Sequence, residues 1–167
     1  MIELQAEALT PEAFAPYGDV VESAETQALE MNAESFQRFD DLCKVEAHEG
    51  RVAISIARCR IATDLPHQID MVERHPHGSQ AFVPLTPCTM MVVVAPAGPS
   101  VAVAELRAFV SNGHQGINYH RGTWHMPLIA FNAGQEFLII DRLGGSPNCD
   151  LLPLAEPVTL LAAPDAQ

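Results

Sequence analysis

The sequence predicts a mainly β protein, folded as a sandwich or a barrel, and three observations support this prediction. Short segments of alternating apolar and polar residues recur along most of the chain. Pro, Gly or Asn separates almost all of these segments. The 13 prolines among 167 residues favour many turns and few long helices. Regular short strands between such turns are typical of sandwiches and barrels.

The clearest predicted strand covers residues 51–58. Val52, Ile54 and Ile56 recur there at every second position, so they share one face of an extended segment. The same kind of reading predicts further strands at residues 69–75, 80–85, 89–95, 106–111, 117–119, 124–131 and 137–142.

One short helix is expected near the start of the chain. Thr10 can cap it, Pro11 suits the first helical position, and Glu12 favours the positive end of the helix. This helix should end near Tyr17. The tail contains three prolines after residue 150 and cannot form one helix. No repeat or linker divides the chain, so we expect a single domain over residues 1–167.

The composition argues against several classes of function. A net charge of −12 and a single lysine, Lys44, oppose binding to nucleic acid. No apolar run is long enough to span a membrane, so no membrane association is expected. The start of the chain does not resemble a signal peptide, which favours the cytoplasm and reduced thiols. The four cysteines form no CxxC pair, so a cysteine zinc site is not expected.

Four of the seven histidines fall in two short clusters, at residues 73–80 and 118–125. His75 and His77 are two positions apart in a segment that Pro76 makes extended, so they should share a face. Gln80 can join them if Gly78 allows a turn or bulge. Such imidazoles can bind a divalent metal or carry protons. The alternative is that each histidine is solvated or satisfied within the core.

The second cluster is expected to form a hairpin. If Arg121 and Gly122 form a two-residue turn, then His120 and His125 share one face. A turn longer by one residue would separate them. With the two-residue turn, we predict that five side chains converge on one pocket: His75, His77, Gln80, His120 and His125.

A longer set of motifs resembles the ureidoglycolate lyase family. These motifs lie at residues 14–20, 73–84, 106–109, 112–113, 116–125, 141–142 and 148–150. The resemblance implies a cupin-type β-barrel with a few short helices and a homodimer. It also implies cleavage of (S)-ureidoglycolate to glyoxylate and urea in allantoin catabolism, a part of purine metabolism. A divalent metal, nickel in particular, is associated with this family.

The resemblance and the chemistry together give candidate roles. A small ureido acid needs a metal or anchor for its carboxylate and hydroxyl, a base and an acid. The candidate metal ligands are His75, His77, Gln80 and His125. His77 stands where the family is expected to have an apolar residue. The neutral amide of Gln80 binds metal weakly, so the metal is expected to be labile.

Other residues are candidates for catalysis and substrate binding. His120 is the candidate proton carrier, and His125 is also expected to be needed for turnover. Arg74 or Arg121 would hold the carboxylate or the ureido oxygen. Candidate substrate contacts are Asn118, Tyr119, Arg38 and Trp124, although packing is the competing role for Trp124.

Three alternatives remain open at this point. The first is another metal-dependent cupin enzyme, such as an oxygenase, which two histidines and one carboxylate would favour. The second is a cupin that binds small carboxylates without turnover. The third is a structural barrel whose histidines are incidental.

Overall fold

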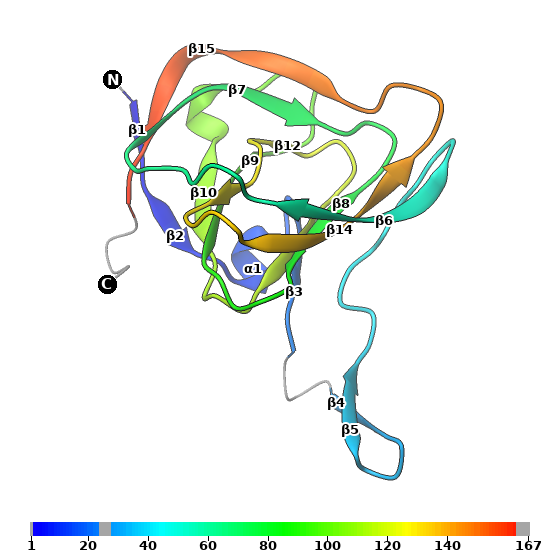
Figure 1. Ribbon diagram of the computed structural model, residues 1–167. Helices are drawn as coiled ribbons and strands as arrows, with labels where there is room; N and C mark the ends of the chain where they lie inside the picture. Colours follow the sequence, from blue (N-terminus) through cyan, green and yellow to red (C-terminus); the bar gives the residue numbers. More distant parts are fainter. Residues whose placement is uncertain (1, 24–27, 163–167) are drawn as a thin grey trace.

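Two curved β-sheets wrap around a common core in the computed structural model, which describes residues 2–23 and 28–162 (Figure 1). The first sheet has the strand order β1-β15-β7-β12-β9-β10-β2, and β13 also pairs with β9. Its strands are β1 (Ile2–Leu4), β2 (Ala6–Ala8), β7 (His67–Arg74), β9 (Met90–Ala95), β10 (Arg107–Val110), β12 (Trp124–His125), β13 (Ile129–Ala130) and β15 (Asp150–Leu160).

The second sheet has the strand order β3-β11-β8-β14-β6, so β6 is an edge strand. Its strands are β3 (Gly18–Val21), β6 (Arg51–Arg58), β8 (Gln80–Pro84), β11 (Gly116–Tyr119) and β14 (Glu136–Leu143). Together the two sheets form a nearly closed barrel, which confirms the expected mainly β, cupin-like fold. A separate hairpin of β4 (Ala28–Met31) and β5 (Phe36–Phe39) projects from this barrel.

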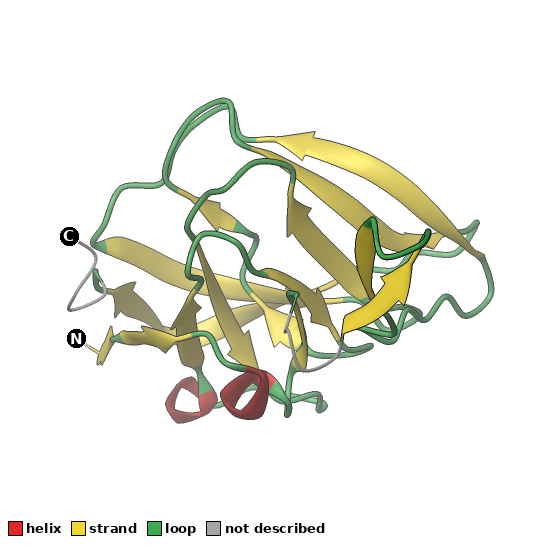
Figure 2. Cartoon of the chain, turned by 90° about the horizontal axis from the view of Figure 1, so that it is seen from below, coloured by secondary structure: helices red, strands yellow, loops and turns green. Residues whose placement is uncertain are grey.

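Among the described residues, helical structure is confined to two short turns, α1 (Pro11–Phe14) and η2 (Val103–Glu105), both at one side of the barrel (Figure 2). The Thr10 side chain accepts a hydrogen bond from the Ala13 N–H at 3.2 Å, which confirms the predicted cap. The helix ends earlier than expected, because only one turn forms before Phe14 enters the core.

Aromatic side chains fill the space between the sheets at the helical side. Phe14, Phe109, Tyr119 and Phe137 are each at most 1% exposed. Phe14 and Phe109 meet edge to face, with ring centroids 5.5 Å apart. Burial of these large apolar surfaces fixes how the strands of the two sheets face one another.

One predicted strand differs from the structure. The segment 124–131 forms two short strands, β12 and β13, because Pro127 lies between them and cannot donate to a ladder. The described part of the tail is not a helix, as expected, and forms the 11-residue strand β15. Its pairing with β7 shifts register between Pro153 and Val158, which accommodates the prolines on an irregular strand.

The expected hairpin around Arg121 is also wrong. The strand before the turn, β11, pairs with β3 and β8 in the second sheet. The strand after it, β12, pairs with β7 and β9 in the first sheet. The turn is closed by the Thr123 N–H donating to the His120 carbonyl at 3.1 Å, and Gly122 has a φ of +81°. This turn is therefore a corner between the sheets, and it sends His120 and His125 to different places.

Candidate functional site

A carboxylate and two imidazoles meet inside the barrel. Glu73 is in β7, His75 directly follows that strand, and His125 in β12 lies opposite Glu73 in the antiparallel register. One ligand atom from each residue lies within 4.8 Å of the others. His125 is 1% exposed, and its ring centroid is 5.1 Å from that of His75. Two imidazoles and a carboxylate at these separations can hold a divalent metal.

Both histidines have one ring nitrogen occupied by the backbone. Nδ1 of His75 lies 2.6 Å from the Asn148 carbonyl, and Nδ1 of His125 lies 3.0 Å from the Thr123 carbonyl. A carbonyl only accepts, so each Nδ1 must carry the hydrogen. In the neutral ring, Nε2 then holds a lone pair, which is the state in which histidine binds metals.

The lone pairs of these two Nε2 atoms face other acceptors. His125 Nε2 is buried without a hydrogen-bond partner, and Oε1 of Glu73 lies 3.6 Å from it. His75 Nε2 lies 3.1 Å from Oε1 of Gln80. The Gln80 amide nitrogen donates to Asp141 at 3.4 Å, which turns its oxygen toward His75. Four acceptor atoms that converge in this way fit a bound cation, because a cation satisfies all of them at once.

Tyr119 forms one wall of this site. Its ring stacks on His125 with centroids 4.1 Å apart and an interplanar angle of 14°. The residue is 1% exposed, and its hydroxyl has no hydrogen-bond partner in residues 2–23 and 28–162. Burial, with the nearby charge of Glu73, raises the pKa of Tyr119. The hydroxyl is therefore a neutral donor held inside the barrel.

Neighbouring histidines stabilise the charged form of Glu73. When no cation is bound and His125 carries a proton on Nε2, a hydrogen bond from His125 lowers the pKa of the Glu73 carboxyl and outweighs the opposing effect of burial. The positive charges of His125 and His75, in their protonated forms, act in the same direction. Glu73 is therefore a carboxylate near neutral pH, ready to bind a cation or accept a proton.

A cavity of about 300 Å³ reaches the site from one side. Glu73 and Gln80 lie at one part of its wall, and Phe82 and Phe137 supply apolar surface. Its lining also includes the exposed residue Arg60, which has no ion-pair partner among the described residues. A guanidinium beside a carboxylate-and-imidazole site is suited to hold an anionic substrate.

The structure does not bring two of the predicted histidines to this site. The backbone turns after Pro76, and the His77 N–H donates to the Asn148 side chain at 2.7 Å. The His77 ring instead lies 3.8 Å from Glu49. His120 directly follows β11 and lies on the other side of the corner from His125. Its Nε2 is 2.9 Å from an oxygen of Asp19.

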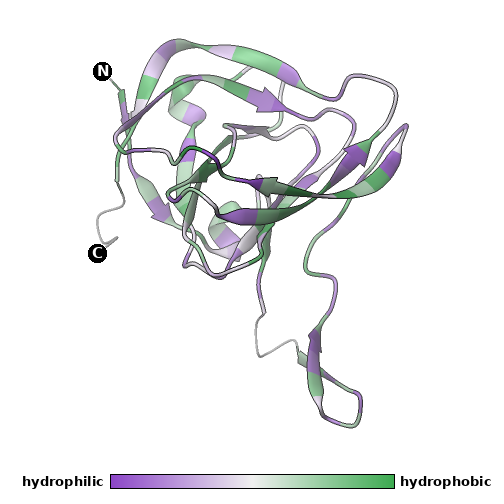
Figure 3. Cartoon of the chain, viewed as in Figure 1, coloured by the Kyte–Doolittle hydropathy of each residue, from purple (hydrophilic) through white to green (hydrophobic). Residues whose placement is uncertain are grey.

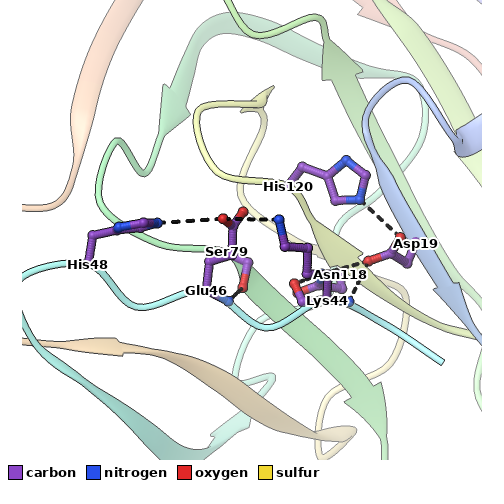
Figure 4. Close-up of polar contacts among 7 residues, drawn as sticks. All are labelled: Asp19, Lys44, Glu46, His48, Ser79, Asn118 and His120. Carbon is purple, nitrogen blue, oxygen red and sulfur yellow. Dashed lines mark hydrogen bonds and ion pairs between the residues drawn. The ribbon is translucent and has the colours of Figure 1, made fainter. Parts of the chain in front are cut away.

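His120 belongs to a polar network on the outer face of the second sheet (Figure 4). The Asn118 amide donates to Asp19 at 2.9 Å and to the Lys44 carbonyl at 3.0 Å. Glu46 lies between Lys44 and His48 and forms an ion pair with Lys44 at 3.4 Å. These contacts hold residues 40–50 across the sheet and occupy the amide nitrogen of Asn118, a predicted substrate contact. The buried Oδ1 of Asn118 has no hydrogen-bond partner among the described residues.

The remaining predicted residues also have structural partners or lie at the surface. Arg74 forms an ion pair with Asp150 at 2.9 Å and lies 4.6 Å over the Trp124 ring. Trp124 is 3% exposed, which agrees with the packing role. Arg121 is exposed, and Arg38 in the projecting hairpin pairs with Asp40 at 2.5 Å.

Two residues of the candidate site were missed from the sequence. Glu73 lies two positions before His75, so the shared-face argument applied to His75 and His77 would also have selected Glu73. Arg60 follows the strand β6, and no local pattern marks it, because its place at the cavity depends on distant segments.

Comparisons with known proteins identify the family of this chain. A profile of the family described as ureidoglycolate lyase matches residues 1–161. A ureidoglycolate lyase of Pseudomonas fluorescens (strain SBW25) is 45% identical over 166 residues, covering 98% of this chain and 99% of the relative. Ureidoglycolate lyases of Stutzerimonas stutzeri (strain A1501) and Pseudomonas savastanoi pv. phaseolicola are 45% and 44% identical, covering 97% and 98% of those relatives and 98% and 99% of this chain. The chain belongs to the ureidoglycolate lyase family.

Proposed function

We propose that this chain is a ureidoglycolate lyase that cleaves (S)-ureidoglycolate to glyoxylate and urea. The observation that carries this proposal is the convergence of Glu73, His75 and His125 inside a barrel whose sequence belongs to that family. The adjoining cavity is about 300 Å³, a size suited to a small polar acid.

The ligand set fits a divalent metal held by Glu73, His75 and His125, with Gln80 as a further oxygen donor. Bound there, such a metal would lower the pKa of a coordinated hydroxyl group and neutralise a carboxylate. Arg60 would attract and orient the carboxylate of the substrate at the cavity. The apolar wall of Phe82 excludes water from one side of the bound molecule.

The reaction then needs one proton to move from oxygen to nitrogen. An oxygen of Glu73 accepts the proton of the substrate hydroxyl, and the carbon–oxygen bond becomes the aldehyde of glyoxylate. The carbon–nitrogen bond breaks, and the proton held on Glu73 passes to the leaving nitrogen, which gives neutral urea. The Tyr119 hydroxyl donates a hydrogen bond in the same buried space and steadies the developing charge. Atoms and charges balance without added water.

A product assay with a matched pair of variants tests this proposal. The wild-type protein with added divalent metal should release urea and glyoxylate in equal amounts. His125→Ala should lose metal binding and most turnover, while His114→Ala, at an exposed position, should retain both. Release of ammonia and carbon dioxide would instead indicate attack on the ureido carbonyl. A folded His125→Ala protein with full activity would refute the assigned role.

A second candidate function is favoured by one observation. Two histidines and one carboxylate are also the ligand set of non-haem iron oxygenases. Such an enzyme would consume oxygen when loaded with iron. Equal turnover of ureidoglycolate with and without oxygen would exclude this candidate.

Further expectations follow from the family resemblance and are part of the proposal. We expect nickel to support activity, and we expect a homodimer that works in the cytoplasm in allantoin degradation. Metal release during purification is expected because Gln80 is a neutral ligand. None of the helices among the described residues is long and apolar enough to cross a membrane.

A further inference from the structure

The edge strand β6 presents an apolar face to solvent. Val52, Ile54 and Ile56 are 46%, 70% and 62% exposed and recur at every second position, so they point to the same side. No strand pairs with the outer edge of β6 in the described part of the chain. A long, apolar, uncovered edge strand is a liability in a soluble protein unless a partner covers it.

The β4–β5 hairpin presents a second apolar face. The cross-strand register places Met31 opposite Phe36 and Leu29 opposite Arg38, so these four side chains share one side of the hairpin. Leu29, Met31 and Phe36 are 55%, 39% and 60% exposed. The hairpin projects away from the barrel (Figure 1), and an isolated two-stranded hairpin is at best marginally stable in water.

These two surfaces hold much of the apolar area that the chain leaves uncovered. Among the described residues, they contain six of the thirteen large apolar side chains that are exposed. Hydrophobic colour appears on both β6 and the hairpin (Figure 3). Scattered apolar residues need no explanation, but two clustered faces on separate elements indicate an interface.

The charges around the two surfaces are complementary. Arg51 and Arg60 lie at or just beyond the ends of β6 and have no ion-pair partner among the described residues. Arg58, at the end of the same strand, is already paired with Glu136 at 2.6 Å. The hairpin and the residues that follow it carry Glu30, Glu34 and Asp41. Arg38, on the apolar face of the hairpin, is paired with Asp40 at 2.5 Å, so it leaves these acidic charges in excess. Basic residues thus border one apolar face and acidic residues border the other, which favours their contact over contact between like faces.

We propose that the apolar face of the β4–β5 hairpin of one copy packs on the outer face of β6 of a second copy. Each chain carries one hairpin face and one β6 face. A symmetric dimer therefore contains two equivalent hairpin–β6 contacts and leaves neither face exposed. The second copy therefore covers the open edge of the barrel and supports the hairpin. This proposal specifies the surfaces of the expected homodimer, and its test does not depend on the reaction catalysed.

Sedimentation velocity on the purified full chain tests the proposal. The wild type should sediment as a dimer, and Ile54→Glu and Phe36→Glu should each raise the dimer dissociation constant at least tenfold. Leu151→Glu is the matched control, because Leu151 is 58% exposed but lies on β15 in the other sheet. The milder variants Ile54→Ser and Phe36→Ser serve if a glutamate variant does not fold, as judged by circular dichroism.

Four outcomes would overturn the proposal. A monomeric wild type would show that no second copy covers these two faces. A Phe36 variant that dimerises normally would remove the hairpin from the interface, and a normal Ile54 variant would remove β6. An equal loss of dimer in Leu151→Glu would show an effect of added charge alone. Retained lyase activity in a monomeric variant would leave the proposed reaction intact while still locating the interface.

Discussion

Replacing Tyr119 by phenylalanine should stabilise the metal-free protein and impair its activity. The tyrosine ring is buried and stacked on His125, so phenylalanine can keep the same packing. Only the hydroxyl is removed, and that group has no protein hydrogen-bond partner. The effect therefore isolates one polar group in an otherwise unchanged core.

The size of the effect follows from the burial of that hydroxyl. A buried polar group without a partner costs about 1–3 kcal/mol of stability. Tyr119→Phe should therefore raise the free energy of unfolding by about 1–3 kcal/mol. For a chain of this length, each kcal/mol corresponds to about 2–4 °C in Tm. Turnover should fall, because the hydroxyl that we propose to steady the developing charge is lost.

The second tyrosine of the chain provides a matched control. Tyr17 is also buried, at 6% exposed, but its hydroxyl is not among the buried side-chain atoms without a partner. Urea unfolding of both variants and the wild type, with a chelator present, measures the stability difference. Destabilisation by Tyr119→Phe, or the same gain in Tyr17→Phe, would refute the reasoning. Unchanged turnover in Tyr119→Phe would remove the hydroxyl from the mechanism.

Three further predictions follow from the structure. His77→Leu should leave metal affinity unchanged in a calorimetric titration, because the ring faces Glu49; a clear loss of affinity would place it at the metal. Arg142→Met should lower the free energy of unfolding in urea titrations by about 1–3 kcal/mol for each carbonyl that it leaves buried without a donor, because this guanidinium donates to the carbonyls of residues 48, 49 and 146; a change as small as that of Arg58→Met would contradict this. Burial raises the pKa of Asp19, but hydrogen bonds from His120, Asn118 and Lys44 outweigh it and leave the pKa below 3.8. The advantage of the wild type over Asp19→Asn should therefore be full above pH 3.8 and disappear as the pH falls through the lower folded pKa; a constant difference down to acid pH would count against it.

The strands were largely predictable because alternation is a local property. Residues 51–58 form β6 with the expected bounds, and the segment 137–142 falls within β14. The β4–β5 hairpin was missed, since its strands are only four residues long and carry polar residues on both faces. The split of 124–131 was missed although Pro127 marks it, because the apolar run on both sides gave a stronger signal.

The candidate site was predictable only where its residues lie within one strand or directly beside it. Glu73 and His75 follow the rule that positions i and i+2 share a face, and the structure brings both to the cation site. His77 obeys the same spacing, but the chain has already left β7, and Asn148 fixes the backbone of the turn. The rule holds only within an extended strand, and β7 ends at Arg74, before His77.

The corner at Arg121 and Gly122 decides which residue faces His125, and its effect is not local. Within one hairpin, His120 and His125 would lie on the same side, and Tyr119 would lie on the other. Because the chain changes sheets at this corner, the inner faces of the two sheets meet across the core instead of lying in one plane. Tyr119, which points inward from β11, then meets His125 pointing inward from β12. The turn sequence allows either outcome, and the pairing of β11 with β3 and β8 selects the corner. The same pairing sets Asp19 beside Asn118, so His120 joins the network that fastens residues 40–50 to the outer face.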